Sequence, residues 1–149
     1  MLPKYPDIEV TIRIDPAMEG CPPIAAEPFV LKHVVQNLMV NAIEATTAAG
    51  KTRGTIAIGG TVTSQDGKPC VDLQIRDEGV GIAPDKLVQV FARGFSTKTG
   101  EKRGSGLHWC ANSMLAMSGR IQAESPGPGH GATMHLIIPA IPTPAREAA

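Results

Sequence analysis

Apolar and polar residues alternate in four stretches of the chain, and this pattern predicts β-strands. A period of two puts every second side chain on one face, so clean alternation indicates a sheet with one buried face. The predicted strands are residues 8–14, 56–62, 71–75 and 134–138. Asp66-Gly67 is typical of a hairpin turn between the second and third strands, and Gly127-Pro128-Gly129 of a turn in a last hairpin.

A spacing of three and four residues marks the predicted helices. Apolar side chains recur in this way over residues 27–47, which predicts a long amphipathic helix closed by Gly50. We expect a short helix over residues 86–91 and another over 107–117, stopped by Gly119. Helices covering one face of a mostly antiparallel sheet form a two-layer α/β sandwich, which is the predicted fold class. A parallel Rossmann sheet would need near-continuous apolar strands, which are absent.

One long stretch, residues 92–105, has no periodicity and predicts a mobile loop. It combines glycines and hydroxyls with four cations, which are Arg93, Lys98, Lys102 and Arg103. We expect one domain over residues 1–139, with this loop inside it, and a frayed tail over 140–149.

Composition narrows the functional classes. The chain has 149 residues and balances 14 basic against 14 acidic residues, so it has no net positive field for a nucleic-acid backbone or an anionic membrane. No apolar run is long enough to span a bilayer or to form a signal peptide. Cys21, Cys70 and Cys110 lie far apart, which fits reduced thiols rather than a disulfide framework or a zinc site. We therefore expect a soluble, cytoplasmic domain.

Two asparagines on the long predicted helix are candidate ligands for a magnesium ion. Asn37 and Asn41 are four residues apart, so both amides project from one helix face. An amide oxygen binds magnesium when phosphates supply the remaining coordination. The alternative is that neighbouring backbone caps both amides.

Asp77 is a candidate for binding a purine. It continues the parity of the strand before it, so its carboxylate points to the covered face, where it needs hydrogen-bond donors. An exocyclic amine is such a donor, and Gly79 and Gly81 would let the backbone approach a base closely. The alternative is an ordinary Asp-Gly turn.

Gly104-Ser105-Gly106 opens the predicted helix at Leu107. Free N–H groups at a helix start form an anion site, and Lys102 and Arg103 precede it, so a phosphate fits here. The chain has no Gly-x-x-x-x-Gly-Lys-Ser/Thr loop, which excludes a P-loop enzyme.

The order of these pieces resembles the catalytic ATP-binding domain of sensor histidine kinases of two-component systems. The motifs are Asn37-Leu38-Met39-Val40-Asn41-Ala42, Asp77-Glu78-Gly79-Val80-Gly81, Phe91 to Lys98, and Gly104-Ser105-Gly106-Leu107. The resemblance runs from about Ile8 to Pro139 and implies the Bergerat fold, shared with gyrase and with heat-shock and mismatch-repair ATPases.

The resemblance also implies the residues of the site. Asn41 would coordinate Mg²⁺, Asp77 would accept the adenine amine, and Thr133 matches the strand hydroxyl that supports this aspartate. Asn37, Asn41, Lys98 and Arg103 would be the catalytic residues. The implied ATP contacts are Asn37, Asn41, Asp77, Gly79, Gly81, Ile82, Lys98, Gly104, Ser105, Gly106, Leu107 and Thr133.

One position favours phosphorylation of histidine over hydrolysis of ATP. Members that hydrolyse ATP have a glutamate four residues before the metal asparagine, where Asn37 stands here. An amide is no general base at neutral pH, whereas a neutral histidine attacks the γ-phosphate with its own lone pair.

The chain departs from the resemblance at two positions. Glu44 stands where a phosphate-binding lysine is frequent, which leaves phosphate contact to the loop cations. His108 replaces the last glycine of a frequent Gly-Leu-Gly, and either contacts phosphate or faces solvent. We expect His33 and His130 to be surface residues, and His135 to be structural or exposed.

No histidine of this chain has the context of a phosphoacceptor, so the chain looks like the C-terminal piece of a longer kinase. The implied partners are a dimerisation and phosphoacceptor domain and a response-regulator receiver, and the isolated domain is expected to be monomeric with little turnover. Two alternatives remain, a non-catalytic regulatory module of the same fold and a stand-alone ATPase.

Overall fold

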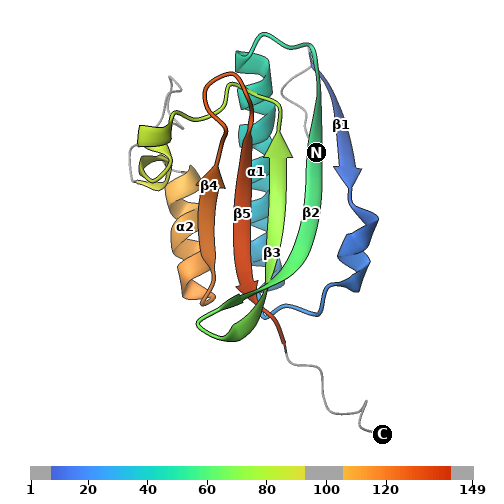
Figure 1. Cartoon of the computed structure of the whole chain (residues 1–149), viewed down its shortest axis with the longest axis vertical. Coiled ribbons are helices and arrows are strands. Elements are labelled where there is room, and N and C mark those ends of the chain that lie inside the picture. The colour runs from blue at the N-terminus through green and yellow to red at the C-terminus, as the bar shows by residue number, and fades with distance from the viewer. Residues whose placement is uncertain (1–7, 93–105, 142–149) are drawn as a thin grey trace, which may run out of the picture.

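Five strands form one mixed sheet with two helices against one of its faces (Figure 1). The computed structural model describes residues 8–92 and 106–141. The strands are β1 (Glu9–Ile14), β2 (Arg53–Gln65), β3 (Lys68–Asp77), β4 (Arg120–Glu124) and β5 (Ala132–Pro139). Their order is β1-β2-β3-β5-β4, and every neighbouring pair is antiparallel except β1 and β2. The predicted two-layer α/β sandwich is confirmed.

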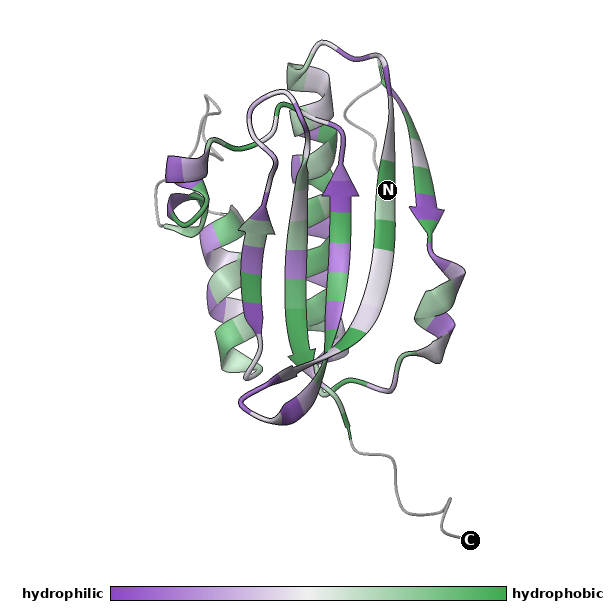
Figure 2. Cartoon of the chain, in the orientation of Figure 1, coloured by the Kyte–Doolittle hydropathy of each residue, from purple (hydrophilic) through white to green (hydrophobic). Residues whose placement is uncertain are grey.

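The β2–β3 hairpin has the predicted turn. Asp66 and Gly67 both adopt positive φ, 54° and 78°, as a two-residue hairpin of the type I′ kind requires. Opposite residues such as Ile58 and Ile75 share a face of the sheet, and hydrophobic and hydrophilic residues alternate along the strands (Figure 2). In the middle of the sheet, the polar side chains lie on the face turned away from the helices.

Helix α1 (Pro28–Ala48) covers the centre of the sheet, close to its predicted bounds. The carboxylate of Glu27 caps it by accepting the N–H of Val30 at 3.0 Å, and Gly50 follows its end with φ 81°. The helix's apolar stripe meets β2, β3, β5 and the second helix in one core. The core residues are Val34, Leu38, Ala42, Ile43, Ile56, Ile75, Cys110, Met114, Leu136 and Ile138.

Helix α2 (Gly106–Ala116) packs beside α1, and Cys110 lies fully buried between them. Burial raises the pKa of the Cys110 thiol to about 12, so this cysteine is an inert apolar residue at neutral pH. The expected stop at Gly119 is wrong in detail. Ser118 adopts the left-handed conformation, with φ 62°, while Gly119 is needed because a Cβ would lie 2.7 Å from the carbonyl oxygen of Ile137.

Three other local predictions need correction. The predicted helix over 86–91 is two short 3₁₀ turns, η2 (Pro84–Lys86) and η3 (Gln89–Phe91). The predicted apolar row of β1 is covered only in its first half, by the packing of Ile8 and Val10 against the core. Its second half is exposed, because β1 lies at the sheet edge beyond α1, before the 3₁₀ turn η1 (Pro16–Gly20). Ile14 is 64% exposed as a result.

The third correction concerns the predicted frayed tail. Its first two residues are bound, since the N–H of Ala140 donates to Pro69 and that of Ile141 to Pro23. The rest of the tail, and the predicted cationic loop from residue 93 on, lie outside the described residues.

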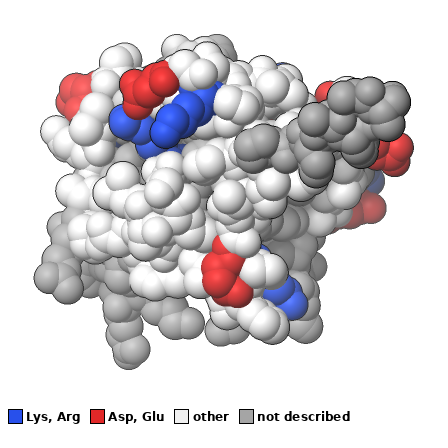
Figure 3. Space-filling model, turned by 90° about the horizontal axis from the view of Figure 1, so that it is seen from below, with Lys and Arg blue, Asp and Glu red and all other residues white. Residues whose placement is uncertain are grey.

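None of the helices within residues 8–92 and 106–141 is long and apolar enough to cross a membrane. Seen from below, acidic and basic side chains lie in small mixed groups rather than in a field of one sign (Figure 3). The three cysteines are free thiols, as predicted.

Candidate active site

One face of α1 connects the two halves of the predicted site. Asn37, Asn41 and Ala45 recur at intervals of four residues, so they follow one another along that face. A Cβ at Gly106, the first residue of α2, would lie 3.4 Å from Oδ1 of Asn37. A Cβ at Gly79 would lie 2.5 Å from the Cβ of Ala45. Helical rise puts Asn37 and Ala45 about 12 Å apart along α1, and the half-buried Asn41 lies midway between them.

We call the Gly79 side of this face the base end. Its central residue is Asp77, the last residue of β3, which follows the parity of the buried Ile75 toward the helices. The N–H of Gly79 donates to Oδ1 of Asp77 at 2.8 Å, and the backbone of Ala132 also hydrogen-bonds to the carboxylate. Burial raises the pKa of Asp77, while these two backbone bonds oppose that shift.

The Gly79 bond to Asp77 is the Asp-Gly turn of the alternative interpretation. It does not exhaust the carboxylate, because an ionised carboxylate accepts about four hydrogen bonds. The turn and a contact with a purine amine are therefore compatible.

The glycines of the base end are required by the protein's own backbone. Besides the contact of Gly79 with Ala45, a Cβ at Gly81 would lie 2.2 Å from the carbonyl oxygen of Gly127. A Cβ at Gly131 would lie 2.3 Å from the carbonyl oxygen of Asp77. Gly81 and Gly131 also adopt positive φ, 77° and 74°. This packing explains the glycine motif before any ligand is considered.

Ser125 joins the two loops of the base end and was missed in the sequence. Its hydroxyl donates to the carbonyl of Gly131 at 2.7 Å and accepts the N–H of Ile82 at 3.0 Å. It also accepts the N–H of Gly127 at 3.1 Å. A serine two residues before a glycine is typical of a local side-chain turn, and that signal would have found it.

The structure does not support the expected role of Thr133. In the ladder between β3 and β5, Asp77 is opposite Ala132, and Thr133 is opposite Arg76. Opposite residues share a face and successive residues alternate, so the Thr133 side chain lies on the other face from the Asp77 side chain. The backbone of Ala132 supports the carboxylate instead.

We call the Gly106 side of the α1 face the phosphate end. Nδ2 of Asn37 donates to the carbonyl of His33 at 3.1 Å, so backbone caps this amide, as the alternative interpretation expected. Its Oδ1 faces Gly106. Leu107 packs against the core and fixes the first turn of α2. Lys98, Arg103, Gly104 and Ser105 lie outside the described residues.

His108 has neither of its two expected roles. Its Nδ1 lies 3.2 Å from the carbonyl oxygen of Phe91, and its Nε2 lies 3.2 Å from Nδ2 of Asn112. Because a carbonyl only accepts, Nδ1 carries the hydrogen and Nε2 accepts from Asn112. His108 therefore ties α2 to η3.

The other three histidines are His33, one turn before Asn37 on α1, His130, in the loop before Gly131, and His135, on β5. His33 and His130 are exposed, as predicted, and His33 meets Trp109 edge-on with ring centres 6.3 Å apart. His135 is structural. It lies on the helix-free face of the sheet, where its Nδ1 is 3.0 Å from Asp72 and its Nε2 is 2.7 Å from Glu124.

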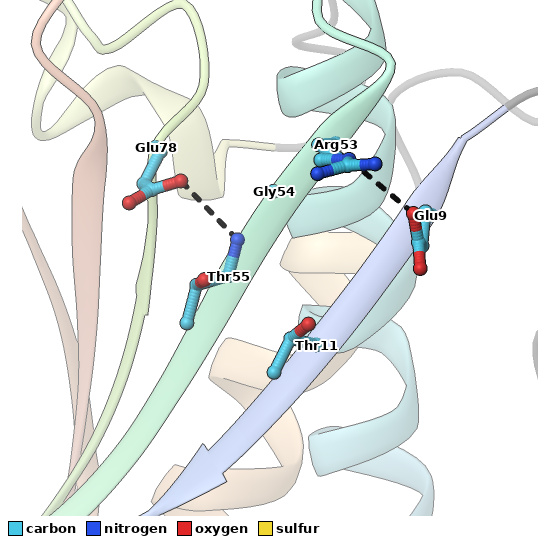
Figure 4. Close-up of a pocket in the computed structure, with 6 residues that line it drawn as sticks. All are labelled: Glu9, Thr11, Arg53, Gly54, Thr55 and Glu78. Carbon is cyan, nitrogen blue, oxygen red and sulfur yellow. Dashed lines mark hydrogen bonds and ion pairs between the residues drawn. The ribbon is translucent and has the colours of Figure 1, made fainter.

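Two cavities flank the base end on the helix-free side of the sheet. One, of about 340 Å³, is lined by Asp77, Ala132 and polar residues of β3, β4 and β5. The other, of about 220 Å³, lies over the start of β1 and β2 (Figure 4). Its lining residues are Glu9, Thr11, Arg53, Gly54, Thr55 and Glu78.

The donors present fit a magnesium nucleotide. Asn41 offers a neutral amide oxygen midway between the two ends, and magnesium is bound in proteins by one or two such ligands together with phosphate oxygens and water. Within the described residues no group of three or more His, Cys, Asp or Glu side chains is placed to hold a metal. A metal at this site would therefore depend on the nucleotide for most of its ligands.

Comparison with known proteins points to one family. The profile of the histidine kinase-, DNA gyrase B- and HSP90-like ATPases matches residues 26–142. Sensor histidine kinase ZraS of Escherichia coli (strain K12) is 35% identical over 131 residues, 88% of this chain and 26% of ZraS. Sensor protein CitS of Halalkalibacterium halodurans is 31% identical over 134 residues, 89% of this chain and 24% of CitS. The chain thus spans about a quarter of these relatives.

Solved structures of histidine kinases are similar to this chain as well. The catalytic domain of histidine kinase ThkA is 26% identical, with a TM-score of 0.67 over 91% of this chain and 82% of that one. A mycobacterial sensor histidine kinase, MprB, has a TM-score of 0.69 over 94% of this chain and 87% of that one, and at 23% identity it supports the fold alone. The resemblance drawn from the four motifs is confirmed.

Proposed function

The chain belongs to the histidine kinase-, DNA gyrase B- and HSP90-like ATPase family, as the ATPase catalytic domain of the sensor-kinase type, and from this premise we propose that it binds ATP with Mg²⁺ and transfers the γ-phosphate to a histidine. The acceptor histidine belongs to a dimerisation domain outside this chain. A response-regulator receiver takes the phosphate next.

One observation carries the proposal, namely the continuous face of α1 that joins the base end to the phosphate end. Asp77 at one end accepts the adenine amine beside two backbone donors. At the other end Gly106 begins α2, whose first N–H groups have no partner within the helix and favour an anion. Asn41 lies between them and would hold a metal ion that neutralises phosphate charge. The separation of about 12 Å between the two ends suits one extended nucleotide.

The chain's own contribution to phosphoryl transfer is positioning. Mg²⁺, held by Asn41, neutralises phosphate charge when it is bound. Asn37, one turn earlier, has its Nδ2 committed to the carbonyl of His33 and no basic atom, so it does not activate water. Asn37 therefore does not assist loss of the proton from an attacking water, whereas a histidine acceptor needs no base. This favours transfer over hydrolysis.

Lys98 and Arg103 are proposed to neutralise the γ-phosphate, and Gly104 and Ser105 to bind phosphate through their backbone. Ile82, Gly79 and Gly81 are proposed to line the adenine pocket. ATP and receiver domains are found in the cytoplasm, so we place the domain there.

The first test is a calorimetric titration of the chain with a non-hydrolysable ATP analogue, with and without Mg²⁺. We expect Mg²⁺-dependent binding. Asp77→Asn should weaken it at least about tenfold, because a charged acceptor contributes about 1.5–3 kcal/mol. Asn41→Ala should remove the dependence on Mg²⁺ at little cost to the helix.

Matched controls are Asp85→Asn, an exposed carboxylate in η2, and Gln36→Ala, an exposed amide on the opposite side of α1. Both should bind like the wild-type chain. No binding by the wild-type chain would refute the nucleotide site.

The transfer step is tested in the parent kinase with γ-labelled ATP. Acid-labile phosphohistidine should form, and Asn41→Ala or Asp77→Asn should abolish it. Steady phosphate release by the isolated chain would favour a stand-alone ATPase, and nucleotide binding with no labelled histidine would favour a regulatory module.

A further inference from the structure

Strands β2 and β3 separate at the base end. Their ladder ends with the pair of Ala57 and Arg76, although the same register would carry on to Thr55 and Glu78. Beyond Asp77 the chain bonds to the loop before β5 instead, where Gly131 donates to the carbonyl of Gly79 at 3.1 Å. The N–H of Thr55 thus has no ladder partner on β3.

The side chain of Glu78 bridges this gap. Its Oε1 accepts the N–H of Thr55 at 3.2 Å, and Figure 4 shows the carboxylate reaching across to β2. A side-chain oxygen therefore takes the place of the missing backbone carbonyl. The end of β3 stays tied to β2 while its backbone leaves the ladder.

Lys51 holds the same residue from the other side. It belongs to the connection between α1 and β2, and its Nζ donates to the carbonyl of Glu78 at 2.7 Å. Next along the chain, Val80 donates to the carbonyl of Ala45 in α1 at 3.1 Å. Residues 78–80 are thereby fixed to both β2 and α1.

The position of Glu78 makes these contacts matter for the site. It stands between Asp77 and Gly79, the two residues joined by the bond that orients the carboxylate. Rotation of the Glu78 peptide groups would move both partners of that bond. The charges of Glu78 and Lys51 act on the Asp77 carboxylate in opposite directions, Glu78 raising and Lys51 lowering its pKa, whereas the hydrogen bonds of both residues fix the backbone direction.

We propose that Glu78 and Lys51 are positioning residues for the nucleobase, which hold the separated end of β3 so that Asp77 presents its carboxylate to the adenine amine. This inference rests on the proposed function.

The same cavity offers a matched control. Glu9 is also an exposed glutamate beside β2, and it pairs with Arg53 at 3.3 Å (Figure 4). Both side chains of that pair are strongly exposed, 73% and 82%, and neither is bonded to residues 77–80 among the described contacts. Loss of Glu9 therefore removes a similar charge without releasing the end of β3.

The experiment measures the affinity of the full 149-residue chain for a non-hydrolysable ATP analogue, with thermal unfolding recorded for each variant. Glu78→Ala should weaken binding about fivefold to tenfold, as expected for loss of one orienting hydrogen bond. Glu78→Gln should bind like the wild-type chain, because its amide oxygen still accepts the Thr55 N–H. Glu9→Ala should leave the affinity unchanged.

Lys51 gives a second, independent pair of variants. Lys51→Met should weaken binding by a similar factor, and Lys51→Arg should restore it, since a guanidinium also donates to a carbonyl. If Glu78→Ala fails to fold, this pair decides the question.

The outcomes separate the inference from the proposed function. Normal binding by Glu78→Ala and Lys51→Met, with binding lost in Asp77→Asn, overturns the positioning role alone. Equal weakening by Glu78→Gln and Glu78→Ala overturns it too, because charge rather than the hydrogen bond would then matter. Normal binding by Asp77→Asn overturns both the base contact and this inference.

Discussion

The base end and the phosphate end of the site are held together in different ways. At the base end, backbone packs closely on backbone in addition to the Ser125 hydrogen bonds, since Gly79 lies against Ala45, Gly81 against Gly127 and Gly131 against Asp77. At the phosphate end, the described contacts are made by side chains. Asn37 bonds to the carbonyl of its own helix, and His108 bonds α2 to Phe91.

This difference indicates which end of the site tolerates substitutions. A close backbone contact leaves no room for a methyl group, and a main chain fixed on both sides cannot shift to make it. A side-chain bond at a helix surface is lost at the cost of one hydrogen bond. We therefore expect a rigid, preformed base pocket and a more adaptable phosphate end.

Comparing an alanine at each end should give the largest effect. Gly79→Ala puts a methyl group 2.5 Å from Ala45 and should destabilise the fold by at least about 1–3 kcal/mol. Gly106→Ala puts one at 3.4 Å from Asn37, at the start of a helix, and should change stability by less than about 0.5 kcal/mol. Urea unfolding of both variants measures this. Equal losses would contradict the asymmetry.

Removal of the Ser125 hydroxyl should have the second-largest effect on the free energy of unfolding. Ser125→Ala leaves the N–H of Ile82 and the carbonyl of Gly131 without this partner, which should cost about 1–3 kcal/mol and weaken ATP-analogue binding. Urea unfolding and calorimetry are the measurements. Ser64→Ala, an exposed serine of β2, is the control and should be silent. Unchanged stability and affinity in Ser125→Ala would mean that the backbone contacts alone hold the base end.

Loss of the His108 side chain should have a smaller and more local effect. His108→Ala removes the bond to Phe91 and should cost about 0.5–1.5 kcal/mol. Amide hydrogen exchange should rise at Ala92 and in the second turn of α2, where the first helix-bonded amides lie, and stay unchanged at Gly79. The exposed His130→Ala should change neither. Faster exchange at Gly79 would show that the two ends are coupled.

The smallest effect should come from His135, on the helix-free face of the sheet. Burial alone would lower the pKa of His135, but its bonds to Glu124 and Asp72 raise it above the ordinary 6.5. The folded protein therefore binds this proton more tightly than the unfolded chain does. The stabilisation should be complete below about pH 6.5 and fade as the pH rises through the folded-state pKa.

Urea unfolding from pH 5.5 to 8.5 tests this, with His135→Gln as the comparison. The wild-type chain should lose up to about 1 kcal/mol relative to the variant as the pH rises, because Glu124 is largely exposed and screened. Affinity for the ATP analogue should follow the same course in both proteins. A difference in affinity would tie the helix-free face to the site.

The sequence predicted those elements whose pattern is local. The Asp66-Gly67 turn, the long helix over residues 27–47 and the inward parity of Asp77 each follow from spacing along the chain, and the structure has all three. Prediction from the sequence is wrong where the position of a residue depends on a partner that is distant in the chain. The family resemblance implies that Thr133 supports Asp77, while the pairing of β3 with β5 puts Ala132 opposite Asp77. Ser125 has a local signal, a serine two residues before a glycine, but its bond to Ile82 depends on the tertiary structure.

The sequence by itself determined the sandwich, the family and the order of the base and phosphate motifs, because hydrophobic period and short motifs are properties of neighbouring residues. Only the tertiary structure decided that β1 is an edge, that Glu78 and Lys51 meet at the end of β3, and that α1 spans both ends of the site. Those facts depend on contacts between residues far apart in the chain. Such contacts are set by the packing of the whole core, which no local pattern records.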